Sequence, residues 1–248
     1  MFEFQTNLLF PVDAVPAAGP LPRGADRLSV GTPDGQKLEG VHIPADQGGA
    51  SKTLVLGFGG NAWNGQDVAE YLHELFPEHE VVAFHYRGYA PSTGEPSGDA
   101  LISDAALVYD AAIARVNPAR VIAVGFSIGT GVAAQLAAKR SLAGLILVTP
   151  FDSLQAVAQS MYPWLPIGAF FSHEIDAAAP LEESAVRVAI LAAERDEIVP
   201  PERTQELRKK VRNLVFDRTI GSAGHNDIYA RSDFHDAMRA SLDALADG

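Results

Sequence analysis

The sequence predicts an α/β protein with a doubly wound, mostly parallel sheet and helices on both faces. Short apolar runs alternate with stretches of helical period along most of the chain. The runs after residue 50 are apolar at nearly every position, which is typical of parallel strands buried on both faces. With 248 residues, 47% of them hydrophobic, there is enough material for one sizeable core, so we expect a single domain over residues 1–248.

The first part of the chain lies outside the alternating pattern. Residues 1–25 are rich in proline, alanine and glycine, and they predict an extended N-terminal arm laid over the domain. Residues 27–30 and 36–43 have strand character and flank the turn sequence at 32–35, Thr-Pro-Asp-Gly. They predict an antiparallel hairpin at the edge of the sheet.

The alternation then continues to the end of the chain. Strands are predicted at the apolar runs 52–56, 81–85, 120–124, 145–148, 187–192 and 214–217. Helices are predicted at the periodic stretches 66–76, 99–116, 128–139, 201–211 and 233–245. Ser97 is a candidate N-cap for the second helix, and Asn117 with Pro118 a candidate stop. Ligands of such sheets bind beyond the carboxyl ends of the strands, so functional residues are expected after each strand.

Residues 151–180 interrupt the alternation between two predicted strands. They carry large apolar side chains among prolines and a glycine. We interpret this stretch as a small cap insertion above the carboxyl edge of the sheet, in which Met161, Trp164 and Phe170 line a substrate pocket. An ordinary crossover helix with aromatic side chains packed on the core is the alternative.

Composition and charge exclude several classes of function. The 19 basic and 31 acidic side chains give a net charge of −12, which disfavours nucleic-acid partners and anionic membrane surfaces. The chain has no cysteine, so disulfides, a thiolate nucleophile and cysteine-ligated metals are excluded. No apolar stretch approaches the ~18 residues of a membrane span, and no signal peptide is recognisable. We therefore expect a cytoplasmic protein.

The most informative motif is Gly125-Phe126-Ser127-Ile128-Gly129, between a predicted strand and a predicted helix. This order is that of a nucleophile elbow, a sharp turn that exposes a serine above the sheet. Side chains two residues before or after the serine would collide with their neighbours, which explains the glycines. The bare pattern arises by chance in about one chain in ten of this size, so a glycine-rich turn with a bystander serine is the alternative.

A serine nucleophile needs a histidine base and a carboxylate, here in the chain order serine, acid, histidine. Asp196 follows the predicted strand 187–192, and His225 lies between the last strand and the last helix. Of the seven histidines, only His225 lies in a loop at the expected edge and in the expected order. Three other carboxylates compete for the acid position: Glu194, Glu197 and Asp152.

The negative charge that forms on a reacting carbonyl needs hydrogen-bond donors. One candidate is the backbone N–H of Ile128, at the N-terminus of the predicted helix. The other is the N–H of Asn61, in the glycine-rich loop 57–65 after a strand. This loop is alternatively a simple turn, and it lacks the third glycine of a dinucleotide-binding fingerprint.

Four motifs together carry a family resemblance over residues 27–245: Gly60 to Asn64, Tyr86 to Pro96, the elbow at Ser127, and Asp196 with His225. With them the chain resembles serine hydrolases of the α/β-hydrolase superfamily, closest to the short-capped group related to prolyl-oligopeptidase-like and dienelactone-hydrolase-like enzymes. The resemblance implies the α/β-hydrolase fold.

Two positions depart from this group. Gly59 stands where a histidine is usual, and Trp63 where a smaller residue is usual; Trp63 is expected at the pocket. Arg87 is expected to hold loops above the sheet by hydrogen bonds, and a catalytic role is the alternative.

These residues predict a serine hydrolase that needs no metal and no cofactor and cleaves a small-molecule ester or thioester through an acyl-enzyme. Two alternatives stay open: a serine peptidase or amidase of the same fold, and a non-catalytic binding protein of that fold. The motifs do not specify the acyl chain, the leaving group or the oligomeric state.

Overall fold

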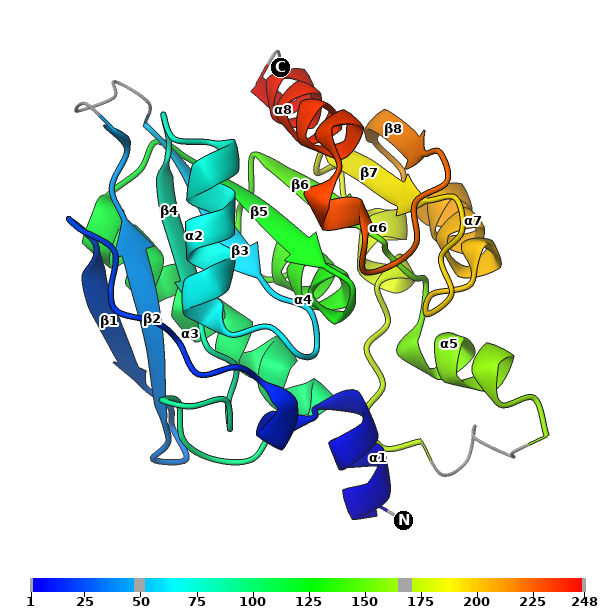
Figure 1. The fold of residues 1–248 in the computed structure, drawn as a ribbon, viewed down its shortest axis with the longest axis horizontal. Helices are drawn as coiled ribbons and strands as arrows, with labels where there is room; N and C mark the ends of the chain where they lie inside the picture. The colour runs from blue at the N-terminus through cyan, green and yellow to red at the C-terminus, as the bar shows by residue number, and fades with distance from the viewer. Residues whose placement is uncertain (1, 47–51, 165–170, 247–248) are drawn as a thin grey trace.

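A single mixed sheet organises the part of the chain that the computed structural model describes, residues 2–46, 52–164 and 171–246 (Figure 1). Its eight strands lie in the order β1-β2-β4-β3-β5-β6-β7-β8. β1 pairs with β2, and β2 with β4, in antiparallel fashion, whereas all other neighbours are parallel. The predicted fold class, a mostly parallel sheet, is therefore confirmed.

The strands run close to their predicted positions. Their bounds are β1 (Asp26–Gly31), β2 (Lys37–Ile43), β3 (Thr53–Phe58), β4 (Glu80–Phe84), β5 (Arg120–Phe126), β6 (Gly144–Val148), β7 (Val188–Ala193) and β8 (Leu214–Ile220). β3, β6 and β7 are buried along their whole length, which explains their uniformly apolar sequences. β1 and β2 form the expected edge hairpin.

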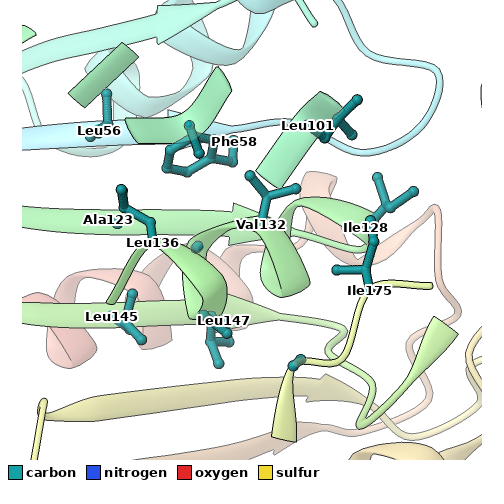
Figure 2. Close-up of a cluster of buried hydrophobic side chains, with 14 of the residues drawn as sticks. Leu56, Phe58, Leu101, Ala123, Ile128, Val132, Leu136, Leu145, Leu147 and Ile175 are labelled. Carbon is teal, nitrogen blue, oxygen red and sulfur yellow. The ribbon is translucent and has the colours of Figure 1, made fainter. Parts of the chain in front are cut away.

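Helices cover both faces of the sheet (Figure 1). Their bounds are α2 (Gly65–Leu75), α3 (Gly98–Val116), α4 (Ile128–Ala137), α5 (Leu154–Met161), α6 (Ala178–Glu183), α7 (Pro201–Lys210) and α8 (Ser232–Ala246). α3, α4, α6 and α7 bury their apolar residues in one core cluster, part of which Figure 2 shows, and α2 and α8 bury theirs in a second. As predicted, Ser97 caps α3 by accepting the Ala100 N–H, and Asn117 ends the helix in a left-handed conformation.

The N-terminal arm predicted for residues 1–25 is wrong in its first part, where the chain forms α1 (Phe2–Leu9). The prolines and glycines that suggested an extended arm begin only at Pro11, and nothing in 2–9 breaks a helix. A short 3-10 turn (Val12–Ala14) follows. Residues 15–25 then run without helix or strand to β1, and the side chains of Asn64 and Gln66 donate to carbonyls of this stretch.

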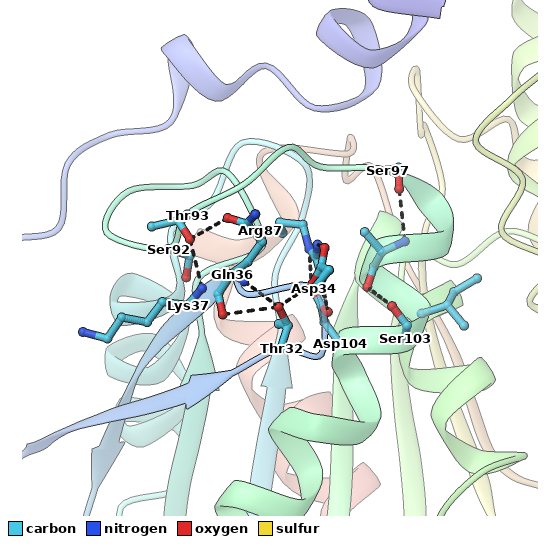
Figure 3. Close-up of polar contacts among 12 residues, drawn as sticks. Thr32, Asp34, Gln36, Lys37, Arg87, Ser92, Thr93, Ser97, Ser103 and Asp104 are labelled. Carbon is cyan, nitrogen blue, oxygen red and sulfur yellow. Dashed lines mark hydrogen bonds and ion pairs between the residues drawn. The ribbon is translucent and has the colours of Figure 1, made fainter.

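A buried arginine ties the segment between β4 and α3 to two other parts of the fold (Figure 3). Nε and Nη2 of Arg87 donate to the two carboxylate oxygens of Asp104 in α3, at 2.9 and 2.7 Å. Nη1 donates to Asp34 in the β1–β2 turn. These paired bonds match the expectation that Arg87 holds loops above the sheet.

We expect Asp104→Ala to lower the free energy of unfolding by about 3 kcal/mol, because it leaves the Arg87 guanidinium buried without its two-pronged partner. The matched control is Asp110→Ala, which breaks an exposed pair with Arg140 and should cost less than about 1 kcal/mol. Urea unfolding of the two variants measures both changes. Equal losses would contradict a special role for the buried pair.

Candidate active site

Ser127 lies in the turn between β5 and α4 with a backbone conformation that is rare outside glycine, at φ 50° and ψ −117°. The flanking glycines leave no room for side chains. A methyl group on Gly129 would lie 2.2 Å from the carbonyl oxygen of Phe58, and one on Gly125 would lie 2.4 Å from the carbonyl oxygen of Gly129. The geometry is that of a strand-turn-helix elbow, with the steric reason expected for both glycines.

Three side chains distant in the sequence meet at this turn. Nε2 of His225, in the loop after β8, lies 3.0 Å from Oγ of Ser127. Nδ1 of the same ring lies 2.9 and 2.8 Å from the two carboxylate oxygens of Asp196, in the loop after β7. Oδ1 of Asp196 also accepts the backbone N–H groups of Ile198 and Val199, which hold the carboxylate in place. The structure thus brings together the three residues that the sequence nominates.

The competing carboxylates have other partners. Glu194 accepts the backbone N–H of Ser222 at 2.7 Å, and Glu197 accepts the backbone N–H of His225 at 3.1 Å. Asp152 pairs with Arg203 of α7 at 3.2 Å, and burial raises the pKa of its carboxyl. In the described part of the chain, Asp196 is the carboxylate that bonds to the His225 ring. The two glutamates instead fix the backbone of the loop that carries the histidine.

The two residues expected to supply the oxyanion donors, Ile128 and Asn61, line the same cavity as Ser127. Ile128 is the first residue of α4, so no carbonyl within that helix can accept its N–H. Asn61 and its neighbour Gly60 line the same cavity as Ser127, and a methyl group on Gly60 would lie 3.8 Å from the Ser127 Cβ. At Gly59 a methyl group would meet the Val68 side chain at 2.9 Å. Gly59, where the resembled group usually has a histidine, therefore allows this loop to lie close to α2.

A cavity of about 430 Å³ opens next to Ser127 and His225, and its wall is mostly apolar. α5 contributes four of the side chains that line it: Leu154, Val157, Ala158 and Met161. The predicted lining residues Trp63 and Met161 are both present. The aromatic ring of Trp63 packs on Tyr71, Phe126 and Tyr229, with centroid distances of 5.1 to 5.5 Å.

Trp164 and Phe170 were also predicted to line the pocket. Trp164 is 74% exposed and does not line the cavity, so that prediction is wrong. α5 ends at Met161, and the chain beyond it turns the indole onto the ring of Tyr162, which does line the cavity. Phe170 lies outside the described residues.

Sequence reasoning missed several residues of the cavity wall, among them Leu8, Leu9 and Tyr229. Leu8 and Leu9 come from α1, whose only sequence signal was a short stretch free of proline and glycine. Tyr229 follows His225 by four residues, and burial raises its pKa to about 12, so its hydroxyl stays protonated at neutral pH. Its sequence neighbours, Ile228 and Ala230, form no motif that would place Tyr229 at the cavity.

Comparisons with known proteins agree with this fold. A family model described as "alpha/beta hydrolase fold" matches residues 54–170. An uncharacterized protein of Mycobacterium tuberculosis is 31% identical over 222 residues, which cover 86% of this chain and 78% of that protein. Lysophosphatidylserine lipase ABHD12 of Danio rerio is 31% identical over 187 residues, 67% of this chain and 48% of the lipase.

A Pyrococcus furiosus esterase has the same fold, with a TM-score of 0.75 at 19% identity and coverage of 94% of this chain and 95% of the esterase. None of the helices in the described ranges combines the length and apolar character needed to cross a membrane.

We expect Gly129→Ala to destabilise the protein by about 3 kcal/mol or more, since its methyl group would overlap the backbone carbonyl of Phe58. The control is Gly31→Ala, because a methyl group on Gly31 in β1 meets nothing within 4 Å. Thermal unfolding of both variants measures the difference. The steric account fails if Gly129→Ala unfolds at the wild-type temperature.

Proposed function

The chain belongs to the α/β-hydrolase superfamily, and we propose that it is a serine hydrolase that cleaves esters or thioesters of apolar acyl groups. The observation that carries the proposal is the hydrogen-bonded triad Asp196–His225–Ser127 beside an apolar cavity. The names of the related lipase and of the esterase with the same fold support hydrolysis.

The geometry supports a two-step reaction. Oγ of Ser127 attacks the acyl carbonyl carbon as Nε2 of His225, 3.0 Å away, takes the hydroxyl proton. Asp196, bonded to Nδ1, keeps that nitrogen protonated and stabilises the imidazolium that forms. The backbone N–H groups of Ile128 and Asn61 bond the carbonyl oxygen as it becomes negative.

The tetrahedral intermediate then collapses to products. The bond from the acyl carbon to the alcohol or thiol breaks, and His225 returns the proton to that leaving group. An acyl ester on Ser127 remains. His225 next takes a proton from water, which attacks the acyl carbon, and the carboxylic acid leaves as Oγ regains its proton.

The surroundings of the cavity favour an apolar acyl group as the part of the substrate that is bound. Hydrocarbon and aromatic surface beside Ser127 comes from α5, from Trp63 and from the α1 leucines. Burial of an acyl chain against this surface stabilises the complex roughly in proportion to the length of the chain. Leu8, Met161 and Ile198 are exposed lining residues, so apolar surface extends to the opening. This surface favours esters and thioesters of acyl chains over peptides with polar side chains.

We expect a fluorophosphonate probe to label the folded wild-type protein and to leave Ser127→Ala unlabelled, since only an activated serine displaces fluoride from phosphorus. Ser160→Ala is the control, because Ser160 is an exposed serine of α5 whose hydroxyl donates to the Ala156 carbonyl of the same helix. Gel fluorescence and peptide mapping give the readout. Absence of labelling in the wild-type protein, or equal labelling of Ser127→Ala, refutes the serine mechanism.

We expect Ala158→Phe to shift activity toward shorter acyl chains, because the new ring occupies part of the cavity. On p-nitrophenyl esters of graded length, kcat/KM for the longest chain that the wild type accepts should fall roughly 10-fold more than kcat/KM for the acetate.

Ser160→Phe places the same ring at an exposed position of α5 that does not line the cavity, and it should keep the wild-type profile. The same profile in both variants would argue against this cavity as the acyl site. Faster turnover of dipeptide amides than of every ester would favour a peptidase.

A further inference from the structure

Two tyrosines of the segment between β4 and α3 bond to the loop that carries Asn61. The hydroxyl of Tyr86 donates to the carbonyl of Gly59 at 2.8 Å, and the hydroxyl of Tyr89 donates to the carbonyl of Asn61. Their rings meet edge to face, with centroids 5.8 Å apart. Neither side chain lines the cavity beside Ser127, so neither is placed to touch the acyl group.

The two bonded carbonyls flank a single peptide unit, formed by the C=O of Gly60 and the N–H of Asn61. In a trans peptide these two groups point in opposite directions. The Gly60 carbonyl accepts the N–H of Trp63 across a turn, at a long 3.4 Å. Since this internal bond is weak, the hydrogen bonds from the two tyrosine hydroxyls are the stronger restraints on the orientation of the Gly60–Asn61 peptide.

The tyrosines are themselves held in place. Arg87 lies between them in the sequence and is clamped to Asp104 and Asp34 (Figure 3). Tyr89 is fully buried, and burial raises the pKa of both hydroxyls, so both remain donors across the range in which a histidine base works. Hydrogen bonds thus connect α3, through Arg87 and the two tyrosines that flank it, to the loop beside Ser127.

We propose that Tyr86 and Tyr89 are positioning residues of the oxyanion hole, which keep the N–H of Asn61 directed at the carbonyl oxygen of the substrate. They act through the Gly59 and Asn61 carbonyls and touch no reacting atom. The inference rests on the serine hydrolase function proposed above. It gives the tyrosines of the Tyr-Arg-Gly-Tyr sequence a part in the reaction, whereas Arg87 keeps its structural one.

The test compares Tyr86→Phe and Tyr89→Phe with Tyr109→Phe. Tyr109 is a matched control because its hydroxyl also donates to a backbone carbonyl, that of Ser141, but at the surface of α3. On a p-nitrophenyl ester, each of the first two variants should lose about 5- to 20-fold in kcat with KM within about twofold, since the acyl cavity is unchanged. Tyr109→Phe should keep the wild-type kcat.

A second readout separates positioning from folding. An alkylboronic acid forms a tetrahedral adduct with the serine, and its inhibition constant should rise by the same factor as kcat falls. Thermal unfolding is measured alongside. Tyr86 is only partly buried, so Tyr86→Phe tests the proposal by itself if Tyr89→Phe does not fold.

The outcomes distinguish this inference from the function on which it rests. If the wild type turns over esters and Ser127→Ala does not, but both tyrosine variants match Tyr109→Phe in kcat and boronate inhibition, the positioning role is refuted and the function stands. A lower unfolding temperature with unchanged kcat also refutes it. If the wild type neither turns over esters nor binds the boronic acid, the proposed function fails and the inference fails with it.

Discussion

The tight contact between the start of α4 and the end of β3 is the constraint on which the site depends. It requires glycine at 129, because a side chain there would overlap the Phe58 carbonyl, and it allows the helix to begin directly after the strand. Ser127 then adopts a backbone conformation with positive φ that costs about 1–3 kcal/mol. Buried neighbours on both sides, Phe126 and Ile128, anchor the turn in the core and offset that cost. The serine is thereby exposed to the cavity above the sheet.

The remaining groups are brought to this turn by the carboxyl edge of the parallel strands. The loops after β7 and β8 carry Asp196 and His225, and backbone N–H groups fix the carboxylate while Glu194 and Glu197 fix the histidine loop. Asp196 thus bonds the imidazole, whereas Glu194 and Glu197 bond backbone N–H groups of the histidine loop. The cavity wall, in contrast, is assembled from distant apolar segments, α1, the loop at Trp63 and α5. The loops that carry the reacting groups add to this wall, since Trp63 shares its loop with Asn61, and Ile198 and Tyr229 follow Asp196 and His225.

The sequence predicted what depends on local pattern. Buried strands and the elbow have such patterns, and the order of Ser127, Asp196 and His225 along a parallel sheet brings them to one edge. The prediction ended β8 at residue 217, whereas the strand runs to Ile220. β8 is an edge strand, and the exposed polar residues near its end lack the apolar pattern on which the prediction relied. α1 was missed because the average composition of residues 1–25 concealed eight residues suited to a helix. The exposure of Trp164 and the bonds of Tyr86 and Tyr89 to loop carbonyls depend on tertiary packing, which periodicity does not encode.

The central claim is that Oγ of Ser127 forms a covalent bond with the acyl group during turnover. Acid quenching of the protein within the first turnovers of a p-nitrophenyl ester, followed by intact-mass and peptide mass spectrometry, tests it directly. The account predicts a single added acyl group, located on the peptide that contains Ser127. Ester turnover at the same rate by Ser127→Ala, or an adduct located on another residue of the working enzyme, would contradict it.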